Sequence, residues 1–209
     1  VTTQIEPHDW IAEICHTLIR VNNVVNDLNN DMWMYIANDV FILKTIKNEV
    51  GSSTMPHKVN PIDFENSEGN IGLANSMFNF FAEKLPISRL QRDLSDSTAL
   101  RNIGVAFGYS LISYKSTLNG LGKISPNNKK INEELDNNWS VLSEAVQTIM
   151  RLENIENAYE KLKELTRGKN LNQKIYLEFI ENLDISQKNK DYLKNLNPRN
   201  YIGVAPKLK

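Results

Sequence analysis

The segment 51–66 concentrates groups that could bind or transfer charge. Gly51 is followed by two serines and a threonine, so the backbone can bend sharply and direct several N–H groups toward one point. Their hydroxyls could hydrogen-bond an anion, or remove a proton if one of them is ionised. These three residues are Ser52, Ser53 and Thr54. The same residue types also suit an ordinary polar turn between two helices, and composition alone leaves both interpretations open.

Positive potential is expected just after these hydroxyls. Lys58 carries a full charge, and Asn60-Pro61 followed by Asp63 is typical of a helix start with Asn60 at the N-cap. The positive end of that helix would face the segment. Turn amides, a helix N-terminus and a lysine together suit a carboxylate, or a carboxylate that gains charge in a transition state.

A second set of residues could bind phosphate. Ser97 and Arg101 are four residues apart, so they share one face of a helix, and Arg92 lies just upstream. A hydroxyl and two guanidinium groups make a suitable phosphate site. A solvated helix face with a pair of surface arginines is the alternative interpretation, which the residue types do not exclude.

Long amphipathic helices must position both sets. Apolar residues recur at steps of three and four over 8–37, 62–84 and 94–121. The first helix would be about 45 Å long at 1.5 Å per residue. The third has a nearly heptad spacing, which favours packing at a shallow crossing angle. We therefore predict a helical bundle with apolar stripes left over for partner subunits.

The pattern changes after the third helix. Gly120, Gly122 and the run 125–128 interrupt it, and no segment shows the alternation of a strand. The fold class is therefore all-α, with a helical-bundle domain over 1–122 and a small helical C-terminal domain over 123–209. The shorter helices of the second domain are expected at about 129–151, 155–166, 172–183 and 186–195.

Composition limits the classes of function. The net charge of −1 gives no basic surface for nucleic acid, and no apolar run approaches the roughly 20 residues that span a bilayer. The single cysteine, Cys15, is expected in the core of a protein from a reducing compartment. The histidines His8, His16 and His57 lack the spacing of metal ligands, so we expect no metal and no cofactor. The chain begins Val-Thr-Thr-Gln, which suggests a fragment or a processed product.

The run from Gly51 to Pro61 resembles the mobile catalytic loop of the fumarase/aspartase superfamily, Gly-Ser-Ser-x-Met-Pro-x-Lys-x-Asn-Pro. Its extension to Asn66 and the run 92–102 are similar to the adenylosuccinate lyase family in particular. The resemblance runs over nearly the whole chain and covers about the C-terminal half of such an enzyme. It implies a long-helix bundle and a β-elimination in purine biosynthesis. That reaction releases fumarate from adenylosuccinate to give AMP, and from the succinylated aminoimidazole carboxamide ribotide.

The resemblance also implies roles for single residues. Ser52 matches the general base, and the loop amides with Lys58 would stabilise its ionised form. Ser53 and Thr54 would bind the substrate carboxylate. Further substrate-binding positions are matched by Gln4, Lys58, Asn60 and Asn66 and, around the nucleotide, by Arg92, Ser97 and Arg101. The loop is expected to be mobile when empty and to close over substrate.

The family's catalytic histidine lies in an upstream motif that has no match in this chain, and His57 occupies a variable position of the loop pattern. We therefore expect this polypeptide alone to be inactive. The resemblance implies a cytoplasmic homotetramer whose active sites are shared between subunits, with small-molecule partners only. Two alternatives stay open. One is another superfamily lyase, of the fumarase, aspartase or argininosuccinate lyase type, and the other is a non-catalytic helical scaffold.

Overall fold

A computed structural model describes residues 3–44, 60–91, 94–166 and 171–207. The chain divides into two compact units, Val1–Asn127 and Asn128–Lys209. Helices dominate both units, which confirms the predicted all-α class. None of the helices in the described ranges has the length and apolar character that crossing a membrane requires.

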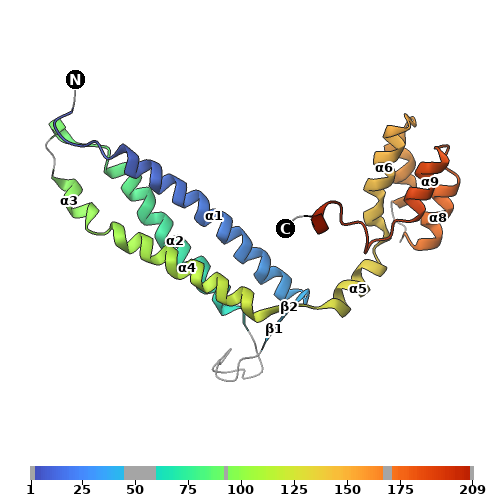
Figure 1. The fold of residues 1–209 in the computed structure, drawn as a ribbon, viewed down its shortest axis with the longest axis horizontal. Coiled ribbons are helices and arrows are strands. Elements are labelled where there is room, and N and C mark those ends of the chain that lie inside the picture. The colour runs from blue at the N-terminus through green and yellow to red at the C-terminus, as the bar shows by residue number, and fades with distance from the viewer. Residues whose placement is uncertain (1–2, 45–59, 92–93, 167–170, 208–209) are drawn as a thin grey trace. The chain divides into compact units, whose positions relative to one another are not determined.

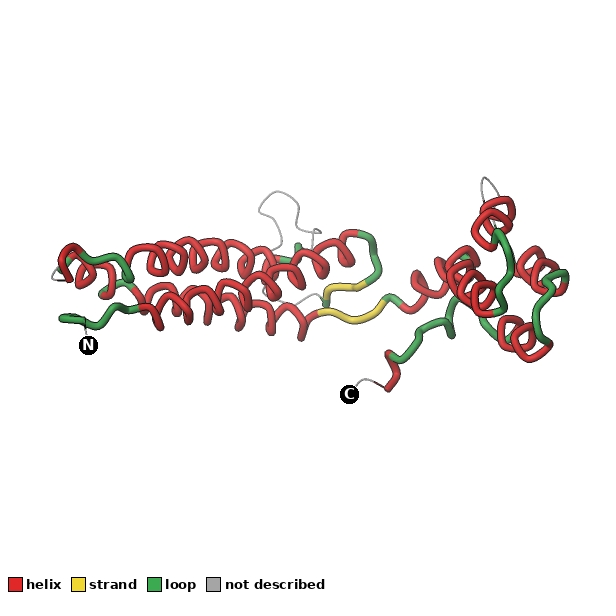
Figure 2. The backbone as a smooth tube through the Cα atoms, turned by 90° about the horizontal axis from the view of Figure 1, so that it is seen from above, coloured by secondary structure: helices red, strands yellow, loops and turns green. Residues whose placement is uncertain are grey.

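The first unit is built on three long helices, which lie side by side in both views (Figures 1 and 2). They are α1 (Asp9–Ala37), α2 (Ile62–Lys84) and α4 (Ile103–Lys123). The chain runs along the bundle in α1, returns in α2 and runs forward again in α4 (Figure 1). The bounds of α1 and α2 agree with the predicted ranges 8–37 and 62–84 to within one residue.

An apolar core fills the bundle near the start of α1. Cys15, Ala74 and Phe78 are fully buried there, and the ring of Phe78 meets that of Phe107 edge-on with 5.3 Å between centroids. Burial raises the pKa of the Cys15 thiol, so this group stays protonated and behaves as a small apolar residue. The expected place of Cys15 in the core is confirmed.

Buried polar side chains connect the three helices in the middle of the bundle and toward the end of α1. Asn29 of α1 donates to Ser67 of α2 at 2.8 Å and accepts from Thr117 of α4 at 2.8 Å, and the two hydroxyls lie 2.8 Å apart. All three are buried, so each helix supplies one member of a closed polar triad. A second layer is centred on Asn22, which bonds to Asn75, Ser110 and Tyr114. Such layers fix the axial register of helices, because a shift would leave buried polar groups unpaired.

The connection from α2 to α4 differs from the prediction of one helix over 94–121. A short 3-10 helix, Arg89–Gln91, precedes α3 (Ser95–Leu100), and α3 and α4 are separate. The break occurs at Asn102, whose side-chain amide donates to the Thr98 carbonyl at 3.1 Å while its backbone N–H bonds three residues back to Ala99. Asparagine competes in this way with the helical ladder.

The first unit also contains a two-stranded ribbon that was not predicted. Strands β1 (Phe41–Leu43) and β2 (Ile124–Pro126) pair antiparallel, with Leu43 opposite Ile124. Three residues are too few to show an alternating pattern.

Gly120 was predicted to interrupt the helical pattern, but it lies inside α4. A glycine is needed at this position because a Cβ there would come within 2.7 Å of the Phe64 ring. Since α4 continues to Lys123, the two units divide at 127/128 and not at 122/123.

The second unit is a small helical unit with its own core. Leu142, Met150, Ile180 and Leu193 are fully buried, and Tyr176 packs among them with its hydroxyl donating to the Leu193 carbonyl at 2.8 Å. Burial raises the pKa of Tyr176, so the phenol remains a donor. The helices are α5 (Asn128–Asp136), α6 (Ser143–Leu152), α7 (Ala158–Thr166), α8 (Gln173–Glu181) and α9 (Gln187–Lys194), with 3-10 turns at Trp139–Leu142 and Ala205–Lys207.

The polar triad gives a first prediction. Asn29→Ala leaves the Ser67 and Thr117 hydroxyls short of partners, so it should lower the free energy of unfolding by about 1–3 kcal/mol. Replacing all three members by apolar residues of similar shape, as Asn29→Leu, Ser67→Ala and Thr117→Val together, should cost less than Asn29→Ala. Urea denaturation measures both, with exposed Asn30→Ala as the control. A triple variant less stable than the single one would contradict this account.

Glu153 gives a prediction that depends on pH. The Ser186 hydroxyl and the Asn189 amide donate to its carboxylate and hold the pKa of Glu153 below the ordinary 4.5. A lowered pKa stabilises the fold above the unfolded pKa, and this contribution is lost as pH falls through the folded value. Glu153→Gln should therefore unfold at lower urea than the parent chain at pH 7, and the difference should shrink below about pH 4.5. Exposed Glu156→Gln serves as the control, and a difference that grows toward acid would refute the assignment.

Candidate active site

The described members of the predicted site lie in two groups at opposite ends of the bundle. Asn60 and Asn66 belong to the end where α2 begins and α1 and α4 finish. Gln4, Ser97 and Arg101 belong to the other end, where α1 begins, α2 finishes and α3 lies (Figure 1). The part of α2 beyond Asn66 alone spans about 27 Å at 1.5 Å per residue. One chain therefore does not bring the two groups together.

Five predicted members lie outside the described residues. The proposed base Ser52, the carboxylate-binding pair and the lysine fall in 45–59, and the first arginine of the phosphate set falls in 92–93. Both segments lie outside the described residues, as does the segment whose mobility the sequence predicts. The residues concerned are Ser52, Ser53, Thr54, Lys58 and Arg92.

The end that holds Asn60 and Asn66 is shaped by the start of α2. Asn60 is half-buried, and Pro61 rather than Asn60 takes the N-cap position, because Pro61 has a ψ of 53° and helical geometry begins only at Ile62. Asn66 is exposed, one turn further along, and its backbone carbonyl accepts from the Asn70 amide at 2.8 Å. Both asparagines therefore border the junction between the undescribed segment and the positive end of a 23-residue helix.

At the opposite end Ser97 and Arg101 are both exposed. Arg101 follows the last residue of α3 and keeps right-handed helical angles, so the expected spacing of four residues along one face is preserved. Gln4 is exposed in the segment that leads into α1. Three side chains able to donate hydrogen bonds thus lie at this end of the bundle, as a phosphate or nucleotide would require.

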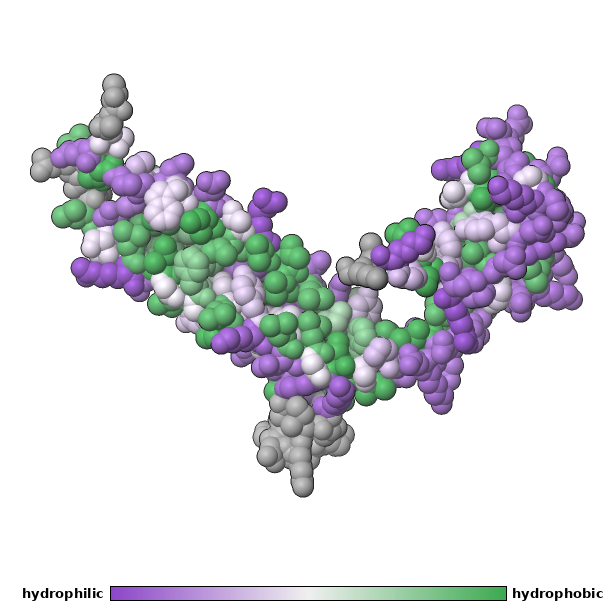
Figure 3. Space-filling model, in the orientation of Figure 1, coloured by the Kyte–Doolittle hydropathy of each residue, from purple (hydrophilic) through white to green (hydrophobic). Residues whose placement is uncertain are grey.

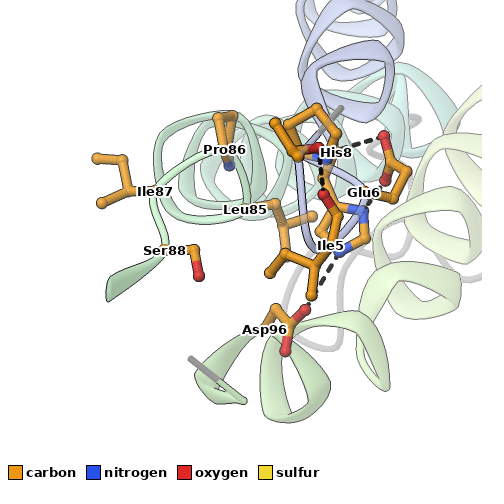
Figure 4. Close-up of a pocket in the computed structure, with 10 residues that line it drawn as sticks. Ile5, Glu6, His8, Leu85, Pro86, Ile87, Ser88 and Asp96 are labelled. Atoms are coloured by element: carbon orange, nitrogen blue, oxygen red, sulfur yellow. Dashed lines mark hydrogen bonds and ion pairs between the residues drawn. The ribbon is translucent and has the colours of Figure 1, made fainter. Parts of the chain in front are cut away.

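A pocket of about 220 Å³ opens beside this group (Figure 4). The segment leading into α1 forms one side of it, and the turn after α2, with Asp96 of α3, forms the other. His8 lies between two carboxylates, paired with Glu6 through Nδ1 and 3.2 Å from Asp96 through Nε2. Its φ of 57° is a left-handed value, which turns the chain into α1.

The His8–Asp96 contact is a feature that the sequence did not predict. The two residues are 88 positions apart and carry no shared motif, so only the return of the chain in α2 brings them together. The charged or titratable groups among the lining residues of the pocket are Glu6, His8 and Asp96, and Arg101 is not among them. Two carboxylates in the wall make the pocket poorly suited to binding phosphate. Among the described residues, no group of three or more histidines, cysteines and carboxylates could hold a metal ion.

Comparison with known proteins agrees with this architecture. Residues 88–202 match the family model described as adenylosuccinate lyase C-terminal, and residues 1–74 match the model described as lyase. Adenylosuccinate lyases of Buchnera aphidicola (subsp. Schizaphis graminum) and Haemophilus influenzae are each 56% identical over 207 residues, 99% of this chain. That of Escherichia coli K12 is 55% identical over 204 residues, 98% of this chain.

The chain spans 45% of the length of each of these relatives. The adenylosuccinate lyase C-terminal model covers more than half of the chain, and the identity to these relatives extends over nearly all of it. This chain belongs to the adenylosuccinate lyase family.

Proposed function

We propose that the chain is the C-terminal part of a lyase that eliminates fumarate from adenylosuccinate to give AMP, and from the succinylated aminoimidazole carboxamide ribotide. The observation that carries this proposal is the 55–56% identity to adenylosuccinate lyases, which extends over 98–99% of the chain. The enzyme would act in the cytoplasm, in purine biosynthesis.

The chemistry needs a base, donors for developing charge and an acid. In the proposal Ser52 takes the proton from the carbon beside a carboxylate, and that carboxylate then gains charge. Turn amides of 51–54, Lys58 and the positive end of α2 would stabilise both the ionised hydroxyl and the developing charge. The proton for the leaving nitrogen would come from a residue outside this chain's set. Asn60 and Asn66 would hold the succinyl part near the base.

The nucleotide would be held by the other group. Arg92, Ser97 and Arg101 would bind its phosphate, with Gln4 nearby on the segment before α1. This set favours a phosphate-bearing substrate over the alternatives of the superfamily, because fumarase-type and aspartase-type substrates carry no phosphate. A non-catalytic scaffold would need neither set.

The separation of the two groups supports a shared active site. About 27 Å of α2 lies between Asn66 and the end of the bundle that holds Ser97. The two groups of residues can therefore contact one substrate molecule only if they come from different chains. Apolar residues gather on the surface of the bundle that Figure 3 shows. The exposed large apolar side chains of the bundle include Val24 of α1 and Leu111 and Leu118 of α4. Since monomers rarely expose such surfaces, we propose that copies of the bundle pack together in a homotetramer.

Two substitutions in the full-length lyase test the assignment. Ser52→Ala should lower kcat at least about 10³-fold while AMP affinity stays within about threefold, because the hydroxyl acts on the succinyl carbon. Arg101→Ala should weaken AMP binding about 10- to 100-fold, because a charged hydrogen bond to phosphate is lost. Fumarate release and titration with AMP measure the two effects. An unchanged kcat in the first variant, or unchanged AMP binding in the second, would count against the corresponding role.

The chain by itself should not release fumarate from adenylosuccinate, because its set of residues lacks an acid for the leaving nitrogen. Mixing or co-expressing it with the part of the Escherichia coli relative that it does not span should restore turnover. Turnover by the chain alone at the rate of an intact enzyme would show that the acid lies within these 209 residues.

A further inference from the structure

We propose that Lys123 is a positioning residue that fixes both ends of the segment 45–59 to the last turn of α4, and that catalysis requires this fixation. The proposal rests on the proposed function, because that segment carries Ser52 and Lys58. It concerns only the described residues on either side of the segment, which are anchored by separate contacts to the same short stretch of chain.

The entry to the segment is anchored through the backbone. Strand β1 pairs with β2 up to Leu43, which lies opposite Ile124, and the Lys44 N–H then donates to the Lys123 carbonyl at 2.8 Å. On the other side of the ribbon the Asn127 N–H donates to the Val40 carbonyl at 2.9 Å. The chain is therefore held from residue 40 to residue 44, directly before the undescribed segment begins.

The exit from the segment is anchored through side chains. The Lys123 ammonium lies 2.7 Å from a carboxylate oxygen of Asp63, in the first turn of α2. The Ser116 hydroxyl donates to the Asp63 carbonyl at 2.8 Å, so the same residue is held twice by α4. Lys123 thus bonds to one end of the segment with its carbonyl and to the other end with its side chain.

Electrostatics favour this ion pair more than an ordinary surface pair. Lys123 lies in the last turn of α4, where the helix dipole is negative, and Asp63 lies in the first turn of α2, where it is positive. Each charge is therefore also stabilised by the dipole of its own helix. The two side chains are only 17% and 18% exposed, so water and salt screen them weakly. The antiparallel course of α2 and α4 brings these two helix ends together.

Packing directly beneath the ion pair is close. Phe64 is 1% exposed, and its ring occupies the space where any side chain at position 120 would have a Cβ, 2.7 Å from the nearest ring carbon. Gly120 is therefore required for α2 to approach α4 at this level. The start of α2, and with it Asn60 and Asn66, cannot move away from α4 without breaking the ion pair and uncovering this ring.

The functional consequence follows from the precision that proton abstraction requires. A displacement of a catalytic group by 1 Å can lower the rate about 100-fold. Fixing the residues on both sides of a segment that carries a base narrows the range of positions open to that base. Lys123 is the residue through which both ends are connected.

The test uses the full-length lyase. Lys123→Met, which keeps the aliphatic part of the side chain, should lower kcat about 10- to 100-fold. AMP affinity should stay within threefold, because Lys123 is not among the residues proposed to bind the nucleotide, and the oligomer mass should not change. Lys123→Arg, which keeps a positive charge beside Asp63, should retain most of the kcat of the parent enzyme. Lys130→Met, which removes a lysine paired with Glu134 at 3.1 Å in the second unit, is the matched control and should leave kcat within twofold.

Two further variants separate positioning from stability. Gly120→Ala forces the Phe64 ring away from α4 but leaves Lys123 and Asp63 unsubstituted. Because it displaces the start of α2, it should also lower kcat more than it lowers AMP affinity. Ser52→Ala combined with Lys123→Met should be no slower than Ser52→Ala alone, because Lys123 acts through the segment that carries the serine.

The outcomes are distinct. An unchanged kcat in folded Lys123→Met, or a loss of AMP affinity and melting temperature in parallel with kcat, overturns the positioning role. A parent enzyme that releases no fumarate overturns the proposed function instead.

Discussion

The packing of α2 between α1 and α4 is the constraint on which the rest of this chain depends. Its buried face runs from Phe64 at one end to Phe81 at the other, with Ser67 and Ala74 between them, so the helix is held along its whole length. Because the polar triad of Asn29, Ser67 and Thr117 fixes the axial register, neither neighbour can slide to shorten the distance between the ends. The bundle therefore acts as a rigid spacer between the two groups of residues that we propose to bind substrate.

The long helices could be predicted because their signals are local. Apolar spacing sets α1 and α2, and Pro61 and Pro86 mark where α2 must begin and end. The errors arise where a distant residue decides the outcome. Asn102 ends α3 through a bond that its type permits but does not require, and Gly120 continues a helix because Phe64, far away in sequence, needs the space. A ribbon of three-residue strands leaves too short a pattern to detect.

In the candidate site too, features that depend on neighbouring residues could be predicted, and features that depend on distant residues could not. The types of residue in 51–66 and 92–101 indicate anion binding, and the family resemblance gives each one a role. Their distribution over two ends of the bundle depends on the return of the chain in α2, which no motif encodes. For the same reason the His8–Asp96 contact and the link between Lys123 and Asp63 were not predicted, since each joins residues at least 60 positions apart. Local motifs predict a chemistry, and the topology determines where the residues of that prediction lie.

The β1–β2 ribbon has a consequence for the order of folding. Leu43 and Ile124 are roughly 80 residues apart, so closing this pair costs chain entropy that the α1–α2 and α2–α4 contacts must already have offset. On a ribosome, Lys123 and Ile124 emerge only after most of the bundle has been synthesised. The described residues on either side of 45–59 therefore come together late, after most of α1, α2 and α4 has been synthesised.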